Sequence, residues 1–236
     1  MKPTPDWELV DRRVKEYEAR QRIINKQMGS APVGGTGRLV VITISRQFGA
    51  GGHSVTEILA KLLGDGWSVW DLEIIDEIAK RADVTRRMVE VLDERRKHWL
   101  QQMGEHILGG KTLDAGGYKH YLVQVLLALA QQGRNIIIGR GANFVLKSAL
   151  NVRLEASMEF RIRQTMVIMN VDRLRAEEMV YTEDRERAQF TRDLFDRDIE
   201  DRTAYDMILR TDCLGFETTA QVILTAARGL FGSEAA

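Results

Sequence analysis

Five short apolar runs, rich in β-branched residues, alternate along this chain with segments of helical periodicity. The runs cover residues 39–44, 67–70, 135–138, 151–154 and 206–209. A parallel strand is buried on both faces, so it reads as a continuous apolar run, and it needs a helical crossover to reach the next strand. The alternation therefore predicts an α/β fold, a parallel sheet with helices on both of its faces.

Helical periodicity between and after these runs predicts eight further segments. They cover residues 53–63, 72–82, 86–103, 117–132, 141–149, 158–170, 173–201 and 216–230. With 236 residues, of which 44% are hydrophobic, the chain is long enough and apolar enough for one sizeable domain with a buried core.

The N-terminal segment is dense in charge and carries a narrow apolar stripe. Its members are spaced as on one helix face: Trp7, Val10, Val14, Tyr17 and Ile24. Residues 29–38 have the Gly, Ser and Pro content of a linker. We therefore predict an amphipathic helix and linker over 1–36 and a main domain over 37–236. The helix would pack on its own domain or, in a homodimer, on a partner subunit.

Composition excludes several classes of protein. The 34 basic and 34 acidic residues cancel, so whole-molecule electrostatics give no reason to expect nucleic acid or anionic membranes as partners. The single cysteine, Cys213, excludes an internal disulfide and a thiolate metal cluster, which favours the cytoplasm as compartment. The N-terminus lacks the apolar core of a signal peptide, and no run of eighteen apolar residues predicts a membrane span.

The first apolar run leads into a glycine-rich turn, "VVITISRQFGAGGHSV", residues 40–55. Gly49, Gly51 and Gly52 would let successive N–H groups face a phosphate, and Ser54 stands where a P-loop hydroxyl reaches Mg²⁺. Against the pattern G-x-x-G-x-G-K-x-[ST], however, the first glycine is Arg46 and the lysine is Gly52. The alternative is that the glycines merely make a tight strand-to-helix turn.

A loop without its lysine needs another cation to meet phosphate. Arg46 is the nearest substitute, because a guanidinium binds phosphate through two parallel hydrogen bonds. His53 is a weaker candidate, since the positive end of a helix dipole disfavours its protonated form. The residues expected to hold phosphate are Gly49, Ala50, Gly51, Gly52, His53 and Ser54.

Five ordered blocks of the sequence resemble the cytidylate kinase-like family, a divergent relative of cytidylate kinases among the P-loop nucleoside monophosphate kinases. The blocks are "ITISRQFGAGGHSVTEILAKLLG", "VWDLEIIDEIAKRA", "IIIGRGANFVL", "VRLEASMEFRIRQTM" and "TEDRERAQFTRDLFDRDIEDRTAYDMILRTDCLGFETTAQVI". The resemblance implies a five-stranded parallel sheet, ATP with Mg²⁺ at residues 49–54, a monophosphate acceptor opposite, and a lid. The reaction it implies is phosphoryl transfer from ATP to CMP or dCMP.

The same resemblance suggests residues for the acceptor. Asp71 stands where cytidylate kinases place an acidic residue near the acceptor nucleotide, although it is equally suited to cap the following helix. Arg140, in "GRGANF", is similar to the arginine that contacts the acceptor, and it follows an apolar run, where a cation can meet phosphate. A purely structural arginine at this position would need a carboxylate partner.

Arginine replaces lysine completely in the last part of the chain. Twelve arginines and no lysine follow Lys147. Interleaved acids predict that most of them pair on solvated helix faces. The resemblance implies a lid over about 160–202 and favours Arg187, Arg192 and Arg197 as catalytic residues. Because these are spaced by five, one straight helix cannot aim all three at one point, so a break near 196–198 is expected.

Two functions follow from these observations. The first is an ATP-dependent kinase of a nucleoside monophosphate in which Arg46 partly replaces the missing lysine. The second is a nucleotide- or phosphate-binding protein with little or no turnover, acting as a sensor or an assembly module.

Overall fold

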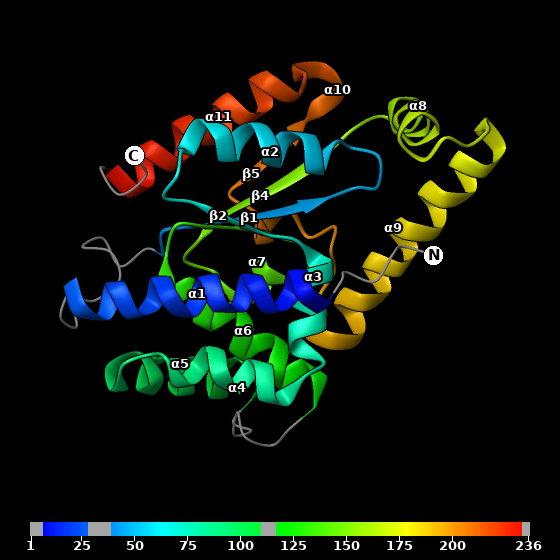
Figure 1. The fold of residues 1–236 in the computed structure, drawn as a ribbon. Helices are drawn as coiled ribbons and strands as arrows, with labels where there is room; N and C mark the ends of the chain where they lie inside the picture. The colour runs from blue at the N-terminus through cyan, green and yellow to red at the C-terminus, as the bar shows by residue number, and fades with distance from the viewer. Residues whose placement is uncertain (1–6, 28–38, 110–116, 233–236) are drawn as a thin grey trace.

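The computed structural model describes residues 7–27, 39–109 and 117–232. Its centre is a sheet of five strands: β1 (Val41–Arg46), β2 (Ser68–Trp70), β3 (Asn135–Ile138), β4 (Leu150–Glu155) and β5 (Met207–Arg210). The order is β2-β3-β1-β4-β5, and every neighbouring pair is parallel (Figure 1). Each predicted apolar run overlaps one strand, which confirms the α/β class and the five-stranded parallel sheet.

The middle of the sheet places three strand ends side by side. Ile42 of β1 is in register with Ile136 of β3 on one side and with Leu150 of β4 on the other. Because the three strands run in the same direction, their carboxyl ends meet at one edge of the sheet. The loops that follow β1 and β3 therefore begin next to each other, and this edge is where parallel sheets bind ligands.

Two helices cover one face of the sheet, α2 (Gly52–Leu63) and α11 (Phe216–Phe231), which lie together above the strands in Figure 1. Their periodic apolar positions are buried, among them Val55 and Leu59 of α2 and Ile223 of α11. They pack against the β1 and β4 side chains of this face in one apolar cluster.

The opposite face carries α3 (Leu72–Ala79), α4 (Ala82–Glu90), α5 (Glu94–Ile107), α6 (Tyr118–Gln132) and the short α7 (Ala142–Val145). The predicted helix 86–103 is in fact two helices. The chain turns at 91–93, where Asp93 accepts a hydrogen bond from the Arg96 N–H at 3.0 Å and so starts α5 as its N-cap. The apolar pattern continues through the turn, which is why periodicity alone joined the two helices.

Helix α1 (Trp7–Gln27) packs on the same face as α4 and α6, within its own chain (Figure 1). Val10, Val14 and Tyr17 of the predicted stripe are fully buried, and the Tyr17 hydroxyl donates to the Ala128 carbonyl at 3.2 Å. These side chains are used in the core of one chain, as the own-domain alternative predicts. The linker predicted over 29–38 lies outside the described residues.

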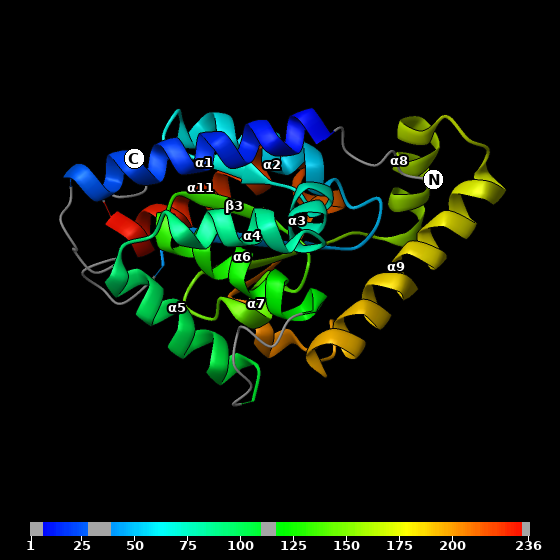
Figure 2. The ribbon, with the colours of Figure 1, turned by 60° about the horizontal axis from the view of Figure 1, so that its bottom comes forward.

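Two helices, α8 (Met158–Met169) and α9 (Arg173–Phe195), are inserted between β4 and β5 and form a hairpin that projects beyond the sheet (Figures 1 and 2). The predicted helix 173–201 was too long. The backbone of Asp196 is left-handed, with φ 53°, and ends α9 there. This is the break that the spacing of Arg192 and Arg197 called for. A single 3-10 turn (Arg202–Ala204) and α10 (Thr211–Leu214) complete the chain before α11.

None of the helices in the described ranges is long and apolar enough to cross a membrane.

Candidate functional site

A cavity of about 270 Å³ opens where the carboxyl ends of β1 and β3 meet the hairpin of α8 and α9, which is called the lid below after the prediction made for it. Five parts of the chain line it: the end of β1, the start of α3, the loop from β3 into α7, one face of α9, and the segment that follows α9. The lining residues are Ser45, Arg46, Leu72, Gly139, Arg140, Gly141, Asn143, Phe144, Glu183, Glu186, Arg187, Phe190, Thr191 and Ile199. Of the predicted site residues, the structure brings Arg46, Arg140 and Arg187 together here.

Arg46 is the last residue of β1, and its side chain passes between two glycines. A Cβ atom at Gly52 would lie 2.9 Å from the Arg46 Cγ, and a Cβ at Gly139 would lie 2.5 Å from Nη1. Both distances are too short for a real contact. The glycine that stands at the lysine position of the P-loop pattern is therefore explained by sterics, because a side chain at 52 would occupy the path of Arg46.

The loop after β3 holds three consecutive residues in the left-handed region: Gly139 (φ 77°), Arg140 (φ 51°) and Gly141 (φ 65°). This conformation costs a residue with a side chain about 1–2 kcal/mol, so Arg140 is strained where it lies. Its Nη2 pairs with Asp76 at 3.2 Å, and its guanidinium lies 4.8 Å from the ring centroid of Phe190. The carboxylate partner expected of a structural arginine is thus present.

Two buried donors in this cavity have no hydrogen-bond partner within the described part of the chain. They are the Arg140 Nε and the Asn143 Nδ2, and Asn143 is only 6% exposed. A buried donor left without an acceptor costs roughly 1–3 kcal/mol. The arrangement therefore suits a ligand that is rich in acceptor oxygens. Sequence reasoning missed Asn143, whose one signal is an amide in the otherwise apolar turn that follows "GRG".

The lid contributes Arg187, which is held against β1. Its Nη1 donates to the Arg46 carbonyl at 3.0 Å, its guanidinium lies 5.3 Å from the ring centroid of Phe48, and Glu183 is 3.7 Å away. Burial, the larger cause, and the adjacent charge of Arg187 lower the pKa of Arg46 to about 9. Burial likewise lowers the pKa of Arg187.

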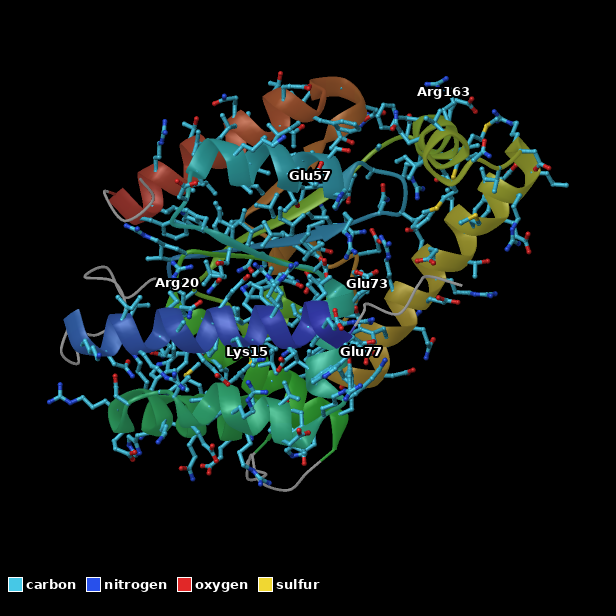
Figure 3. The ribbon with its side chains drawn as sticks, viewed as in Figure 1. Lys15, Arg20, Glu57, Glu73, Glu77 and Arg163 are labelled. Carbon is cyan, nitrogen blue, oxygen red and sulfur yellow. The ribbon has the colours of Figure 1, made fainter. Side chains whose placement is uncertain are left out.

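Acids stand near these guanidiniums without neutralising them fully. Glu73 of α3 and Glu183 of α9 favour the charged form of Arg46, and Arg140 opposes it. Figure 3 shows Glu73 at the end of the sheet that faces the lid. The site thus keeps several cations close together in a partly dry place, and an anionic ligand would relieve their repulsion.

The glycine-rich loop leads directly into α2. Gly51 caps the helix in a left-handed conformation (φ 75°), and the N–H groups of the first turn face away from the helix body. Ser54 is half-buried on that turn, whereas the His53 side chain is 82% exposed and lies 3.3 Å from Glu57. The first turn of a twelve-residue helix is a favourable place for an anion.

Neighbouring elements clamp the loop from several sides. A Cβ at Gly49 would lie 2.5 Å from the Arg161 carbonyl of α8, and one at Gly51 would overlap the ring of Phe216. The Thr211 hydroxyl donates to the Ala50 carbonyl at 2.9 Å. These glycines are needed for close packing as well as for their backbone angles.

A carboxylate of the lid binds the loop directly. Asp184 of α9 accepts from the Phe48 N–H at 2.8 Å through one oxygen and from the Arg161 guanidinium through the other. Together with the bond from Arg187 to the Arg46 carbonyl, this contact joins α9 to the loop at two places.

Other predicted residues lie elsewhere. Asp71 acts as the N-cap of α3, accepting from the Ile74 N–H at 3.0 Å. Arg192 and Arg197 are both exposed, and Arg197 lines other cavities near α7. Five residues of helix rotate a side chain by about 140° beyond a full turn, so Arg192 cannot face the cavity that Arg187 faces.

No group of three or more His, Cys, Asp or Glu side chains that could hold a metal ion occurs in residues 7–27, 39–109 and 117–232.

Comparisons with known proteins agree with this architecture. A model of the cytidylate kinase-like family matches residues 41–213. An uncharacterized protein from Eubacterium ventriosum ATCC 27560 has a similar structure, with a TM-score of 0.62, 18% identity, and coverage of 81% of this chain and 99% of that chain. TT1252 from Thermus thermophilus aligns over 81% of this chain and 98% of its own at 16% identity and a TM-score of 0.44. No curated protein is significantly similar.

Proposed function

The chain belongs to the cytidylate kinase-like family, and from this premise we propose that it transfers a phosphoryl group from ATP to a nucleoside monophosphate, nominally CMP or dCMP. One observation carries the proposal. Arg46, Arg140 and Arg187 converge on one cavity at the carboxyl edge of a parallel sheet, and two buried donors there, on Arg140 and Asn143, lack partners among the described residues.

In this proposal the glycine-rich loop binds the donor. The N–H groups of residues 49–54, at the start of α2, would hold phosphate oxygens, and the Ser54 hydroxyl would hold the metal that accompanies them. ATP supplies the phosphoryl group, and its Mg²⁺ neutralises part of the phosphate charge. Arg46 stands in for the lysine: its aliphatic Cγ and Cδ cross the space that a side chain at Gly52 would fill, and its guanidinium lies beyond them against Gly139.

The acceptor is held from the other side of Arg46. Arg140 and Asn143 donate to its phosphate through the two unpaired groups, while Arg187 reaches in from the lid. Between them the phosphoryl group passes in line, and the arginines stabilise the charge that spreads over its oxygens. Asp71, which caps α3 next to Leu72 of the cavity, stands near enough to the acceptor side to affect its choice.

The second candidate function is binding of a nucleotide or phosphate with little or no phosphoryl transfer. Gly52 favours it, because no side chain at this position can follow the phosphoryl group during transfer. The protein would then be a nucleotide or phosphate sensor, or an assembly module. The two candidates make different predictions about product, so one experiment separates them.

That experiment measures ADP release by the full chain with Mg²⁺ATP and a panel of nucleoside monophosphates, beside ATP binding by calorimetry. Arg46→Ala is compared with Arg163→Ala, an exposed lid arginine far from Glu73 in Figure 3. We expect Arg46→Ala to weaken ATP binding by about 1.5–3 kcal/mol, since its charge-assisted hydrogen bonds are lost. We expect Arg163→Ala to behave as wild type.

Turnover with CMP or dCMP that collapses in Arg46→Ala alone would support the kinase. Binding without product for every acceptor would favour the second candidate. Unchanged ATP affinity in Arg46→Ala would refute the role given to that residue in both.

A further inference from the structure

A second and larger cavity, of about 830 Å³, lies on the face of the sheet covered by α5, α6 and α7. Figure 2 turns these three helices toward the viewer. Leu39, which precedes β1, and Ser148, which precedes β4, place the cavity toward the amino ends of the strands. Phe144 lines both this cavity and the smaller one at the carboxyl edge, so the two are neighbours with a ring between them.

The walls of the larger cavity are mainly apolar. Trp99 and Met103 of α5, Leu127 of α6 and Phe195 of α9 face it with Phe144. Its volume falls within the range of cavities that bind small organic molecules, roughly 300–1,000 Å³. Aromatic side chains from three different elements can pack against a flat ring or an alkyl chain.

Charge on the same walls is strongly one-sided. Five Lys or Arg residues line the cavity, namely Arg95, Arg96, Lys119, Lys147 and Arg197, and His106 joins them. Asp93 is the one carboxylate among the described residues that line the cavity, and it pairs with Arg96 at 3.5 Å. Low-dielectric walls lined by one sign of charge attract the opposite sign.

We propose that this cavity is a binding site for a small organic anion with an apolar body, a carboxylate or sulfonate carried on an alkyl or aromatic group. The apolar body lies among Trp99, Met103 and Leu127, and the acidic group meets the exposed cations Arg95, Lys147 and Arg197. The proposal does not depend on phosphoryl transfer, because no residue of the glycine-rich loop takes part.

A ligand in this cavity would contact residues at the base of the lid. Phe195 is the last residue of α9, its ring stacks on Phe144 with centroids 6.2 Å apart, and a Cβ at Gly141 would overlap it. A ligand that packs against these two rings therefore supports the contact between the base of the lid and the strained loop after β3. The site is placed to influence the cavity at the carboxyl edge without entering it.

The test uses the fluorescent anion 1-anilinonaphthalene-8-sulfonate on the full chain, with the uncharged N-phenyl-1-naphthylamine as its matched probe. Binding is followed by probe emission and by energy transfer from tryptophan, which Trp99→Phe should reduce. Laurate and inorganic pyrophosphate are then added as competitors. We expect one sulfonate probe per chain, weaker binding of the uncharged probe, displacement by laurate, and no displacement by pyrophosphate.

Two variants locate the probe. Lys147→Glu reverses an exposed charge at the cavity, and Lys61→Glu reverses an exposed charge on α2, which covers the opposite face. We expect Lys147→Glu to raise the Kd about fivefold or more and Lys61→Glu to leave it within about twofold, as for one charge pair at a partly buried site. Met103→Trp should weaken binding, because the larger ring takes up part of the space among Trp99, Met103 and Leu127 where the apolar body lies.

Equal effects of the two charge reversals would overturn the proposal, as would displacement by pyrophosphate, which would place the probe at the carboxyl edge. Should Met103→Trp fail to fold, the charge-reversal pair still decides. Loss of kinase turnover in the experiment above would leave these binding results standing, so the two proposals fail separately.

Discussion

The arginines of this molecule fall into two regions that differ in burial and in the partners of the guanidinium groups. The cavity arginines, Arg46, Arg140 and Arg187, approach one another from two strand ends and the lid. The lid-surface arginines, Arg163, Arg173 and Arg175, lie in water and pair with acids of their own hairpin. Arg173, for example, binds Glu159 at 2.6 Å.

The two arrangements differ in their effect on the free energy of folding. Exposed ion pairs stabilise the fold by about 0–1 kcal/mol and require no strained backbone or buried charge. Burial and the charges of Arg187 and Arg140 lower the pKa of Arg46, Arg140 has a strained backbone, and the Arg140 Nε donor has no partner in the described part of the chain. Since such groups reduce stability in the empty protein, their convergence points to a ligand, whereas the number of arginines does not.

The largest expected difference between the two regions is in catalysis, and it is tested by removing one arginine from each. Arg187→Ala should lower kcat roughly 10³-fold, because a lid arginine that stabilises the transferring group is worth at least that much. Arg173→Ala, which loses an exposed pair with Glu159, should stay within about twofold. Steady-state kinetics with the best acceptor measures both. Equal losses would mean that the two regions do not differ in function.

The steric account of Gly52 is tested by a double-variant cycle. Gly52→Lys should displace Arg46 and weaken pyrophosphate binding about 30-fold, or about 2 kcal/mol, by loss of charge-assisted hydrogen bonds. Adding Arg46→Gly should restore affinity, because the new lysine then has room. Calorimetry at neutral pH gives the four affinities. If the double variant binds no better than Gly52→Lys alone, the two positions do not compete for space.

The pKa of Arg46 gives a pH signature that surface arginines lack. Because burial and Arg187 lower this pKa to about 9, the empty protein loses the charge as pH rises through that value. Sulfate affinity should hold below pH 9 and fall up to about tenfold by pH 10. Arg46→Ala should show a flat, lower profile over the same range, and a fall of equal steepness in that variant would assign the titration to another group.

The lowered pKa of Arg46 affects the stability of the fold in the opposite direction from sulfate affinity: stability rises with pH. Between about pH 9 and the ordinary value of 12.5, the unfolded chain keeps a proton that the folded chain has lost, so Arg46 makes the folded state more stable as pH rises there. Urea unfolding of wild type and Arg46→Ala at pH 8 and pH 10 should show their stabilities diverging in favour of wild type. Parallel behaviour would contradict the low pKa.

The smallest expected effect concerns glycine. Gly141 and Gly64 both have positive φ, 65° and 81°, but a Cβ at Gly141 would overlap the Phe195 ring, whereas one at Gly64 meets nothing within 4 Å. Gly64→Ala should cost about 1 kcal/mol from the backbone alone. Gly141→Ala should cost about 1 kcal/mol more from overpacking. The urea unfolding midpoints of the two variants measure the difference. Equal losses of stability would show that the Phe195 ring can move aside without a loss of free energy.

Most of the fold could be predicted because its signal is local. An apolar run of four to six residues followed by a helical period is enough to specify strand, crossover and parallel sheet, and the glycine-rich turn and Arg140 follow directly from strand ends. Two predicted helices were too long: 86–103 ran across the turn at 91–93, and 173–201 ran past Asp196, where only the arginine spacing predicted a break. Both ends depend on a single capping residue within a continuing pattern.

The site was harder to predict because it depends on contacts between side chains from different segments of the chain. The sequence displays the missing lysine, but the reason for Gly52 lies in the path of a side chain six residues earlier. Arg187 and Arg192 look equivalent in the sequence, and only the phase of α9 against the sheet separates them. Asn143 has no charge and no motif, and it is noticed when its amide is found buried without an acceptor.

Asp184 gives the loop a built-in reporter. Its carboxylate covers the Phe48 N–H, so any swing of α9 away from the sheet uncovers that one amide. Solvent exchange of the Phe48 amide hydrogen would then increase with the fraction of molecules in which the lid is open. A single backbone proton thus reports the opening of the hairpin, and a nucleotide that holds the lid shut would slow its exchange.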